Sequence, residues 1–138
     1  MPFALRRGPA PVLGLDRASY RPGEAVCVTV TLPPGADPRG HVRLRCHLPR
    51  DAALDALVDP PEIAGCSTDC VELARAELAP VAERAPDGSQ RLTATVHIPD
   101  DAQPSCRGNE EVASWEVVAV VHRRAASAWV EVVPRGAP

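Results

Sequence analysis

Alternation of apolar and polar residues is the feature of this sequence that most constrains its fold. Between Arg91 and Val121 the chain reads as two strands joined by a long polar connection. The first strand places an apolar residue at every second position: Leu92, Ala94, Val96 and Ile98. Because successive side chains of a strand point to opposite faces, this spacing predicts a strand with one buried face. Pro99 ends it, since proline cannot donate a hydrogen bond to a neighbouring strand.

The second strand of this stretch, from Trp115 to Val121, is apolar on both faces apart from Glu116. A strand without a polar face is typical of the centre of a sheet. We therefore expect it to be central and buried. The connection that precedes it contains prolines, aspartates and a glycine, all of which favour turns.

The same alternation recurs in other parts of the chain. The inward positions of two earlier strands are Val26, Val28, Val30 and Leu32, then Val42, Leu44, Cys46 and Leu48. A short edge strand is expected near residues 12–16, and a last strand contains Ala128, Val130 and Val132. Residues 70–81 fit a helical face about as well as a strand, and their strand-rich surroundings favour the strand.

Sixteen prolines and nine glycines suit many short strands separated by turns, and no alternation of strands with helices is present. The sequence therefore predicts an all-β fold, a two-sheet antiparallel β-sandwich of the immunoglobulin-like kind with seven to eight strands. A length of 138 residues is typical of one domain. We expect a flexible leader over residues 1–10, the sandwich over 11–134 and a tail over 135–138.

Net charge and hydropathy exclude several classes of function. The formal charge is −3, so nonspecific binding to nucleic acid, which needs a strong basic field, is not expected. No apolar run approaches the ~18 residues of an integral membrane segment. The apolar part of the N-terminus is short and interrupted by prolines, unlike a secretory signal. We expect a cytoplasmic protein.

Two short segments together resemble a known fold family. One is Tyr20-Arg21-Pro22-Gly23-Glu24, which opens a strand of alternating valines. The other is Ile98-Pro99, followed by Pro104-Ser105 and Gly108 and then the Trp115 strand. This order resembles the arrestin-like fold, which includes bacterial sporulation-control (Spo0M-type) members and retromer-type sorting proteins. The resemblance implies a non-catalytic adaptor or scaffold. Arrestins carry two such domains, and their phosphate-sensing residues have no counterpart here.

A row of basic side chains is the strongest candidate for partner binding. Its residues follow the spacing of two that places them on one side of one strand: His41, Arg43, Arg45 and His47. They could receive an acidic peptide or a phosphate, or form a solvated face paired with Glu72 or Glu77. Trp129 on the last strand is a second candidate if it is exposed, because aromatic residues are enriched at interfaces. A buried position packed against its own domain is the alternative. A free sheet edge is an alternative surface, for a partner strand or a second copy of the chain.

The cysteines suggest an alternative function based on zinc binding or thiol chemistry. Cys66 and Cys70 are four residues apart, and Cys106 lies in another loop. Zinc favours cysteine and histidine ligands, so these three cysteines could bind it, with His97 or His122 as a further ligand. Strong zinc signals pair two short-spaced motifs, and here there is one. Free thiols and a Cys66–Cys70 disulfide stay open as other readings.

The prediction from sequence is thus a cytoplasmic, non-catalytic adaptor or scaffold that binds a protein partner and needs no cofactor. Ser105-Cys106 near His97 is the one combination that suggests a nucleophile, and no oxyanion-hole glycine motif accompanies it. A zinc- or thiol-dependent protein built on the Cys66/Cys70 loop is the first alternative. A secreted immunoglobulin-like module with four of its five cysteines paired is the second.

Overall fold

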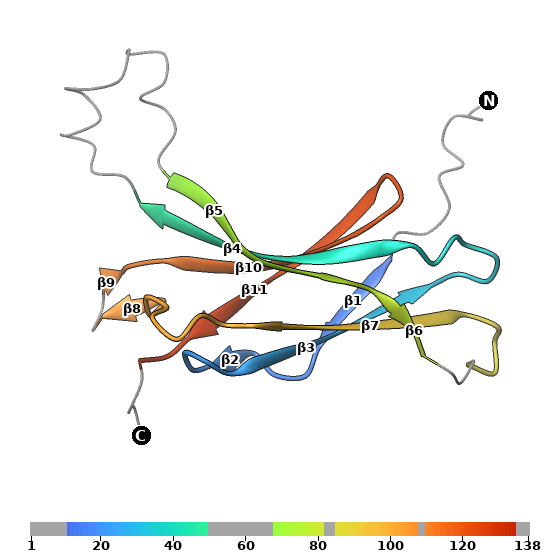
Figure 1. Cartoon of the computed structure of the whole chain (residues 1–138), viewed down its shortest axis with the longest axis horizontal. Helices are drawn as coiled ribbons and strands as arrows, with labels where there is room; N and C mark the ends of the chain where they lie inside the picture. The colour runs from blue at the N-terminus through green and yellow to red at the C-terminus, as the bar shows by residue number, and fades with distance from the viewer. Residues whose placement is uncertain (1–10, 50–67, 82–84, 108–109, 135–138) are drawn as a thin grey trace, which may run out of the picture.

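The protein is a sandwich of two facing β-sheets (Figure 1). The computed structural model describes residues 11–49, 68–81, 85–107 and 110–134, which contain eleven strands and no helix. Consequently none of the described residues belongs to a helix that could cross a membrane. Seven of these strands are four or more residues long, and the other four have two residues each. The predicted all-β sandwich is confirmed, while the predicted leader and tail lie outside the described residues.

One sheet has four strands, all of them paired in antiparallel fashion. Their order across the sheet is β1 (Val12–Leu15), β3 (Ala25–Leu32), β7 (Gln90–His97) and β6 (Ala79–Pro80). The edge strand β6 pairs only with Leu92 and Thr93 of β7. The rest of that side of β7 therefore has no strand beside it among the described residues.

The other sheet has five strands. Their order is β2 (Ser19–Tyr20), β11 (Arg124–Val132), β10 (Ser114–Val121), β4 (Gly40–Pro49) and β5 (Thr68–Glu77). The strand that begins at Trp115 is central, as predicted. Pairing is antiparallel except between β2 and β11, which are parallel. A small two-stranded sheet, β8 (Cys106–Arg107) and β9 (Glu110–Glu111), lies near the start of β10 (Figure 1).

The core lies between the two sheets and consists of the predicted alternating residues. Val26, Val28, Val30, Val42 and Leu44 have no exposed surface. From the other strands the core includes Leu92, Val96, Ile98, Trp115 and Val117. Burial of such side chains stabilises a fold by about 1.5–3 kcal/mol each, so the apolar alternation accounts for the two-layer arrangement.

At the two sides of the sandwich, consecutive edge strands belong to different sheets. On one side β1 belongs to the four-stranded sheet and β2 to the five-stranded sheet. On the other side β5 leads directly into β6, with the buried Leu78 between them donating its N–H to the Gly40 carbonyl at 3.0 Å. The ambiguous stretch 70–81 is thus strand. A bulge at Leu73 interrupts its pairing, because Leu44 faces Ala74 while Arg45 faces Glu72.

The two sequence segments that resemble the arrestin-like fold contact one another. The Gly23 N–H donates to the Ile98 carbonyl, and the Ile98 N–H donates to the Glu24 carbonyl, both at 2.9 Å. Gly23 has φ of 87°, a conformation that glycine adopts at little cost. Ser105 connects the later part of the motif to β11, since its hydroxyl accepts the Val132 N–H at 2.8 Å. These short motifs therefore join distant parts of the chain.

Candidate functional site

The predicted binding residues lie together on the outer face of the five-stranded sheet. The inward side of β4 is buried, so the residues between point outward: His41, Arg43, Arg45 and His47. Across the sheet Arg45 faces Glu116 of β10, and Glu116 faces Trp129 of β11. Opposite residues of antiparallel strands point to the same face. We call this surface, from the β4 row to Trp129, the outer face.

Trp129 is exposed and is held in place by a second ring. Its side chain is 62% exposed, although it belongs to a strand in the interior of the sheet order. The Trp129 indole packs against the His47 imidazole, with ring centroids 5.3 Å apart and planes tilted by 59°. Of the two positions that the sequence allowed for Trp129, buried or exposed, the structure has the exposed one.

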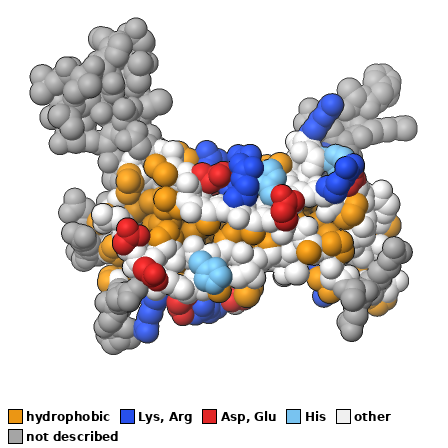
Figure 2. Space-filling view, in the orientation of Figure 1, with side chains coloured by type: hydrophobic (Ala, Val, Ile, Leu, Met, Phe, Trp, Pro, Cys, Tyr) orange, Lys and Arg blue, Asp and Glu red, His pale blue; other side chains and the backbone are white. Residues whose placement is uncertain are grey.

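Charges on the outer face are partly paired. Glu72 of β5 lies 3.3 Å from Arg43 Nε, which is the expected kind of cross-strand pair. It also lies 3.2 Å from Nη2 of Arg75 on its own strand. The hydrogen bond from Arg75 lowers the pKa of Glu72 below its usual value. Figure 2 shows such charged and histidine side chains gathered along the rim over β4 and β5. These exposed pairs contribute little to stability.

Arg45 differs from its neighbours. Within the part of the chain that the structure describes, its guanidinium has no carboxylate within 4.0 Å. The two glutamates that face it in the register are engaged elsewhere: Glu72 by Arg43 and Arg75, and Glu116 by His47 at 2.9 Å. Arg45 is therefore a basic side chain of the outer face that forms no ion pair with the described residues.

Cys70, His47 and Glu116 form a polar cluster on this face. Cys70 Sγ lies 3.8 Å from His47 Nε2, and the same nitrogen lies 2.9 Å from Glu116 Oε1. In a nucleophile–histidine–carboxylate triad the two partners use different ring nitrogens, so that one accepts the proton while the other is oriented. Here both contacts converge on one nitrogen, and the cluster does not have that arrangement.

The two described cysteines of the predicted zinc set lie on different strands. Cys70 lies on β5, Cys106 lies on β8 in the small sheet, and Cys66 is outside the described residues. In the described ranges no three His, Cys, Asp or Glu side chains are placed to hold a metal ion. Cys27, Cys46, Cys70 and Cys106 are free thiols, so none has the pairing that the secreted alternative requires. The zinc set stays a prediction.

The other histidines named with the zinc set lie apart from the outer face. His97 ends β7 in the four-stranded sheet. His122 lies in the turn between β10 and β11, where its Nε2 is 3.1 Å from Asp37 Oδ2. Neither ring has a cysteine within hydrogen-bonding distance among the described residues.

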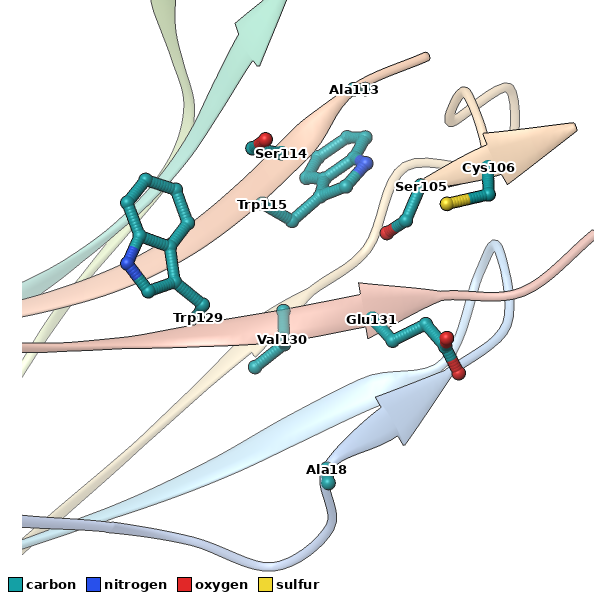
Figure 3. A pocket seen from close by; sticks show the side chains of 9 residues that line it. All are labelled: Ala18, Ser105, Cys106, Ala113, Ser114, Trp115, Trp129, Val130 and Glu131. Atoms are coloured by element: carbon teal, nitrogen blue, oxygen red, sulfur yellow. The ribbon is translucent and has the colours of Figure 1, made fainter. Parts of the chain in front are cut away.

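An open groove of about 590 Å³ adjoins Trp129 at the end of β10 and β11. We call it the Trp129 groove. Its walls include both tryptophans, Val130, Ser105, Cys106 and Glu131. Figure 3 shows Trp115 extending from β10 toward Ser105 and Cys106, while Trp129 rises from β11 and Glu131 extends away from it. Trp115 is buried and donates its Nε1–H to the Gln103 carbonyl at 2.9 Å, so this wall is fixed.

A second groove, of about 610 Å³, separates the edges of the two sheets. Leu73 and Arg75 of β5 form one wall, and Thr95 and His97 of β7 form part of the other. Val71 and Leu73 are each 44% exposed on this side. Figure 2 shows apolar side chains between the charged rim and the lower sheet. The outer edge of β5 has no strand partner in the described residues, and the bulge at Leu73 makes that edge irregular.

Sequence reasoning missed two parts of this arrangement. Glu116 was recognised as the one polar residue of its strand, but its contact with His47 depends on β10 lying between β4 and β11. The Trp129 groove was also missed, because its walls come from the chain segments around Ala18, Ser105, Trp115 and Trp129. No local sequence pattern relates these segments.

Comparisons with known proteins relate the chain to a solved fold. No family model matches it. No curated protein matches it either. A crystal structure of Spo0M, the sporulation control protein from Bacillus subtilis, aligns with a TM-score of 0.59 at 14% identity, over 94% of this chain and 50% of that one. The predicted arrestin-like, Spo0M-like fold is thereby confirmed, and the chain spans half the length of that protein.

Proposed function

We propose that this domain is a non-catalytic adaptor or scaffold module that binds a protein partner through its outer face. The observation that carries the proposal is the exposed Trp129, held against His47 on the same face as the uncompensated Arg45. Tryptophan and arginine are the residues most enriched among those that dominate binding energy at interfaces. A large ring that is already fixed loses little conformational entropy on binding.

The chemistry of the outer face favours binding over catalysis. Cys70 and Glu116 both contact Nε2 of His47, so among the described residues the other ring nitrogen has no partner that would orient it for proton transfer. The similar solved structure is described as a sporulation control protein, a regulatory role that agrees with an adaptor. We also propose a cytoplasmic location, because four free thiols suit a reducing compartment.

The test is capture of a partner in the native cell with matched variants. Tagged wild-type protein, Trp129→Ala and Arg45→Glu are crosslinked and purified at physiological salt, and the crosslinked residues are identified by mass spectrometry. Controls are Val12→Ala, an exposed apolar residue of β1, and Arg91→Glu, an exposed charge of β7. We expect crosslinks to the outer face and about tenfold lower recovery for the two test variants alone. Equal recovery from all five proteins would contradict the proposal.

Self-association through the edge of β5 is the second candidate. It is favoured by the outer side of that strand, which pairs with none of the described strands, and by the exposed Val71 and Leu73. A partner strand could add there through backbone hydrogen bonds. Sedimentation of the wild type and of Val71→Lys over a range of concentrations tests this candidate. A wild-type dimer that the Val71→Lys substitution dissociates supports it, and a wild type that stays monomeric at all concentrations excludes it.

A further inference from the structure

The Trp129 groove is suited to an apolar group. Two indoles and Val130 supply much of its wall. The polar wall groups have partners within the domain: the Ser105 hydroxyl accepts the Val132 N–H at 2.8 Å, and Glu131 Oε1 accepts the Ser19 hydroxyl at 2.9 Å. A polar ligand would have to compete for these bonds. Burial alone favours the binding of an apolar side chain, by about 25 cal/mol of free energy for each Å² of apolar surface removed from water.

The shape of the groove favours a segment of chain over a small molecule. Sites for small molecules bury most of the ligand surface. This groove is open to solvent, and one of its walls, Trp129, belongs to the outer face. An open groove beside a flat sheet can receive one side chain of a segment whose backbone crosses the sheet.

Charge on the outer face defines the rest of the segment. Arg45 lies two strands from Trp129 in the register, which corresponds to about 10 Å at ~4.8 Å between strands. An extended chain covers this distance in about three residues at ~3.3 Å each. On the far side of the groove the charged side chain is Glu131, which disfavours a carboxylate there. A segment with its acidic group toward Arg45 satisfies both conditions.

We infer that the Trp129 groove receives a bulky apolar side chain from an extended acidic segment of the partner, with a carboxylate about three residues away that pairs with Arg45. The inference rests on the proposed function, since it specifies the partner segment that the outer face binds. Trp129 covers the apolar side chain, and Arg45 sets the charge and the register of the segment.

Three nine-residue peptides test the inference. The first has a central Phe with Glu three residues before and after it; the second has Lys in place of both Glu; the third has Ser in place of Phe. Each is titrated into ¹⁵N-labelled protein, whose two tryptophans give two indole N–H signals. We expect the first peptide to shift the Trp129 signal and to bind about tenfold more tightly than the other two. Arg45→Glu is expected to reverse the preference, so that the Lys peptide binds best.

Thiol alkylation reports whether the groove itself is filled. Cys106 lines the groove and is exposed, whereas Cys27 is exposed on the four-stranded sheet and serves as the control. The Phe–Glu peptide is expected to slow alkylation of Cys106 and to leave Cys27 unchanged. Equal binding of the three peptides, or unchanged Cys106 reactivity at saturation, would overturn the inference.

The two proposals fail in different ways. If a cellular partner requires Trp129 and Arg45 but leaves Cys106 alkylation unchanged, the outer face is the binding surface and the groove assignment is wrong. If no partner depends on either residue and no peptide shifts the Trp129 signal, both proposals are wrong.

Discussion

The Trp129 indole and the His47 imidazole lie against each other with centroids 5.3 Å apart, across the strand that separates β11 from β4. His47 is in turn 2.9 Å from Glu116 of that intervening strand. Three strands thus hold one exposed ring in a defined position. An aromatic side chain fixed in this way is prepared for contact with a partner before binding.

Trp129→Ala is expected to weaken partner binding while leaving the stability of the fold almost unchanged. Because the ring is largely exposed, its loss should change the free energy of unfolding by no more than about 0.5 kcal/mol. Partner recovery should fall about tenfold or more. Urea denaturation and the capture assay measure the two quantities. A large loss of stability would instead show that the ring is structural.

Tyr20→Phe is expected to destabilise the fold by about 1–2 kcal/mol in urea denaturation. Tyr20 is buried, and its hydroxyl lies 2.7 Å from Asp16 Oδ1 and accepts the Arg17 N–H at 3.1 Å. The variant leaves these groups without their partner. Ser19→Ala, which removes an exposed hydroxyl next to it, is the control and should have little effect. A Tyr20→Phe protein as stable as wild type would show that solvent replaces the hydroxyl.

The hydrogen bond between Tyr20 and Asp16 also predicts how the stability of the fold depends on pH. Burial and the hydrogen bond to Asp16 raise the pKa of Tyr20 from 10.0 to about 12, so folding favours the neutral phenol. This stabilisation is complete below pH 10 and is lost as the pH rises to about 12. The hydrogen bond from Tyr20 lowers the pKa of Asp16, and that contribution is present above its unfolded pKa and lost as the pH falls through the folded value. The melting temperature of Tyr20→Phe should therefore change less with pH than that of the wild type, at both acid and alkaline pH.

Gly40→Ala is expected to destabilise the five-stranded sheet. A Cβ at this position would lie 2.5 Å from the Val120 carbonyl oxygen, which belongs to the adjacent strand and cannot rotate away. Forcing such a contact typically costs about 1–3 kcal/mol. Gly14→Ala is the matched control, since its Cβ would meet Thr29 at an ordinary 3.8 Å. Thermal denaturation of both variants tests the expectation, which is wrong if they melt together.

Arg124→Met is expected to leave the free energy of unfolding unchanged or to raise it. Arg124 Nη2 is buried and has no hydrogen-bond partner among the described residues. A buried polar group without a partner costs about 1–3 kcal/mol, and methionine fills similar space without that cost. Arg91→Met on the exposed side of β7 is the control for loss of a positive charge. A clear destabilisation of Arg124→Met alone would show that the guanidinium has a favourable role.

Local patterns in the sequence were sufficient for the long strands outside residues 70–81 and for their inward residues. Period-two alternation identified the buried faces of β3, β4 and β7, since a residue's side of a strand depends only on its position along it. The sequence did not distinguish between helix and strand for residues 70–81, because an edge strand with a bulge at Leu73 has irregular periodicity.

Alternation and turn residues act locally, so the amino-acid sequence was enough to predict an all-β sandwich with a basic row on one strand. Three relationships emerged from the folded arrangement: Trp129 lies on the same face as that row, Glu116 lies between them, and Cys106 lies beside both tryptophans. These relationships depend on the order in which strands pair. Pairing order follows from how the whole set of apolar faces is buried together, which no single segment encodes.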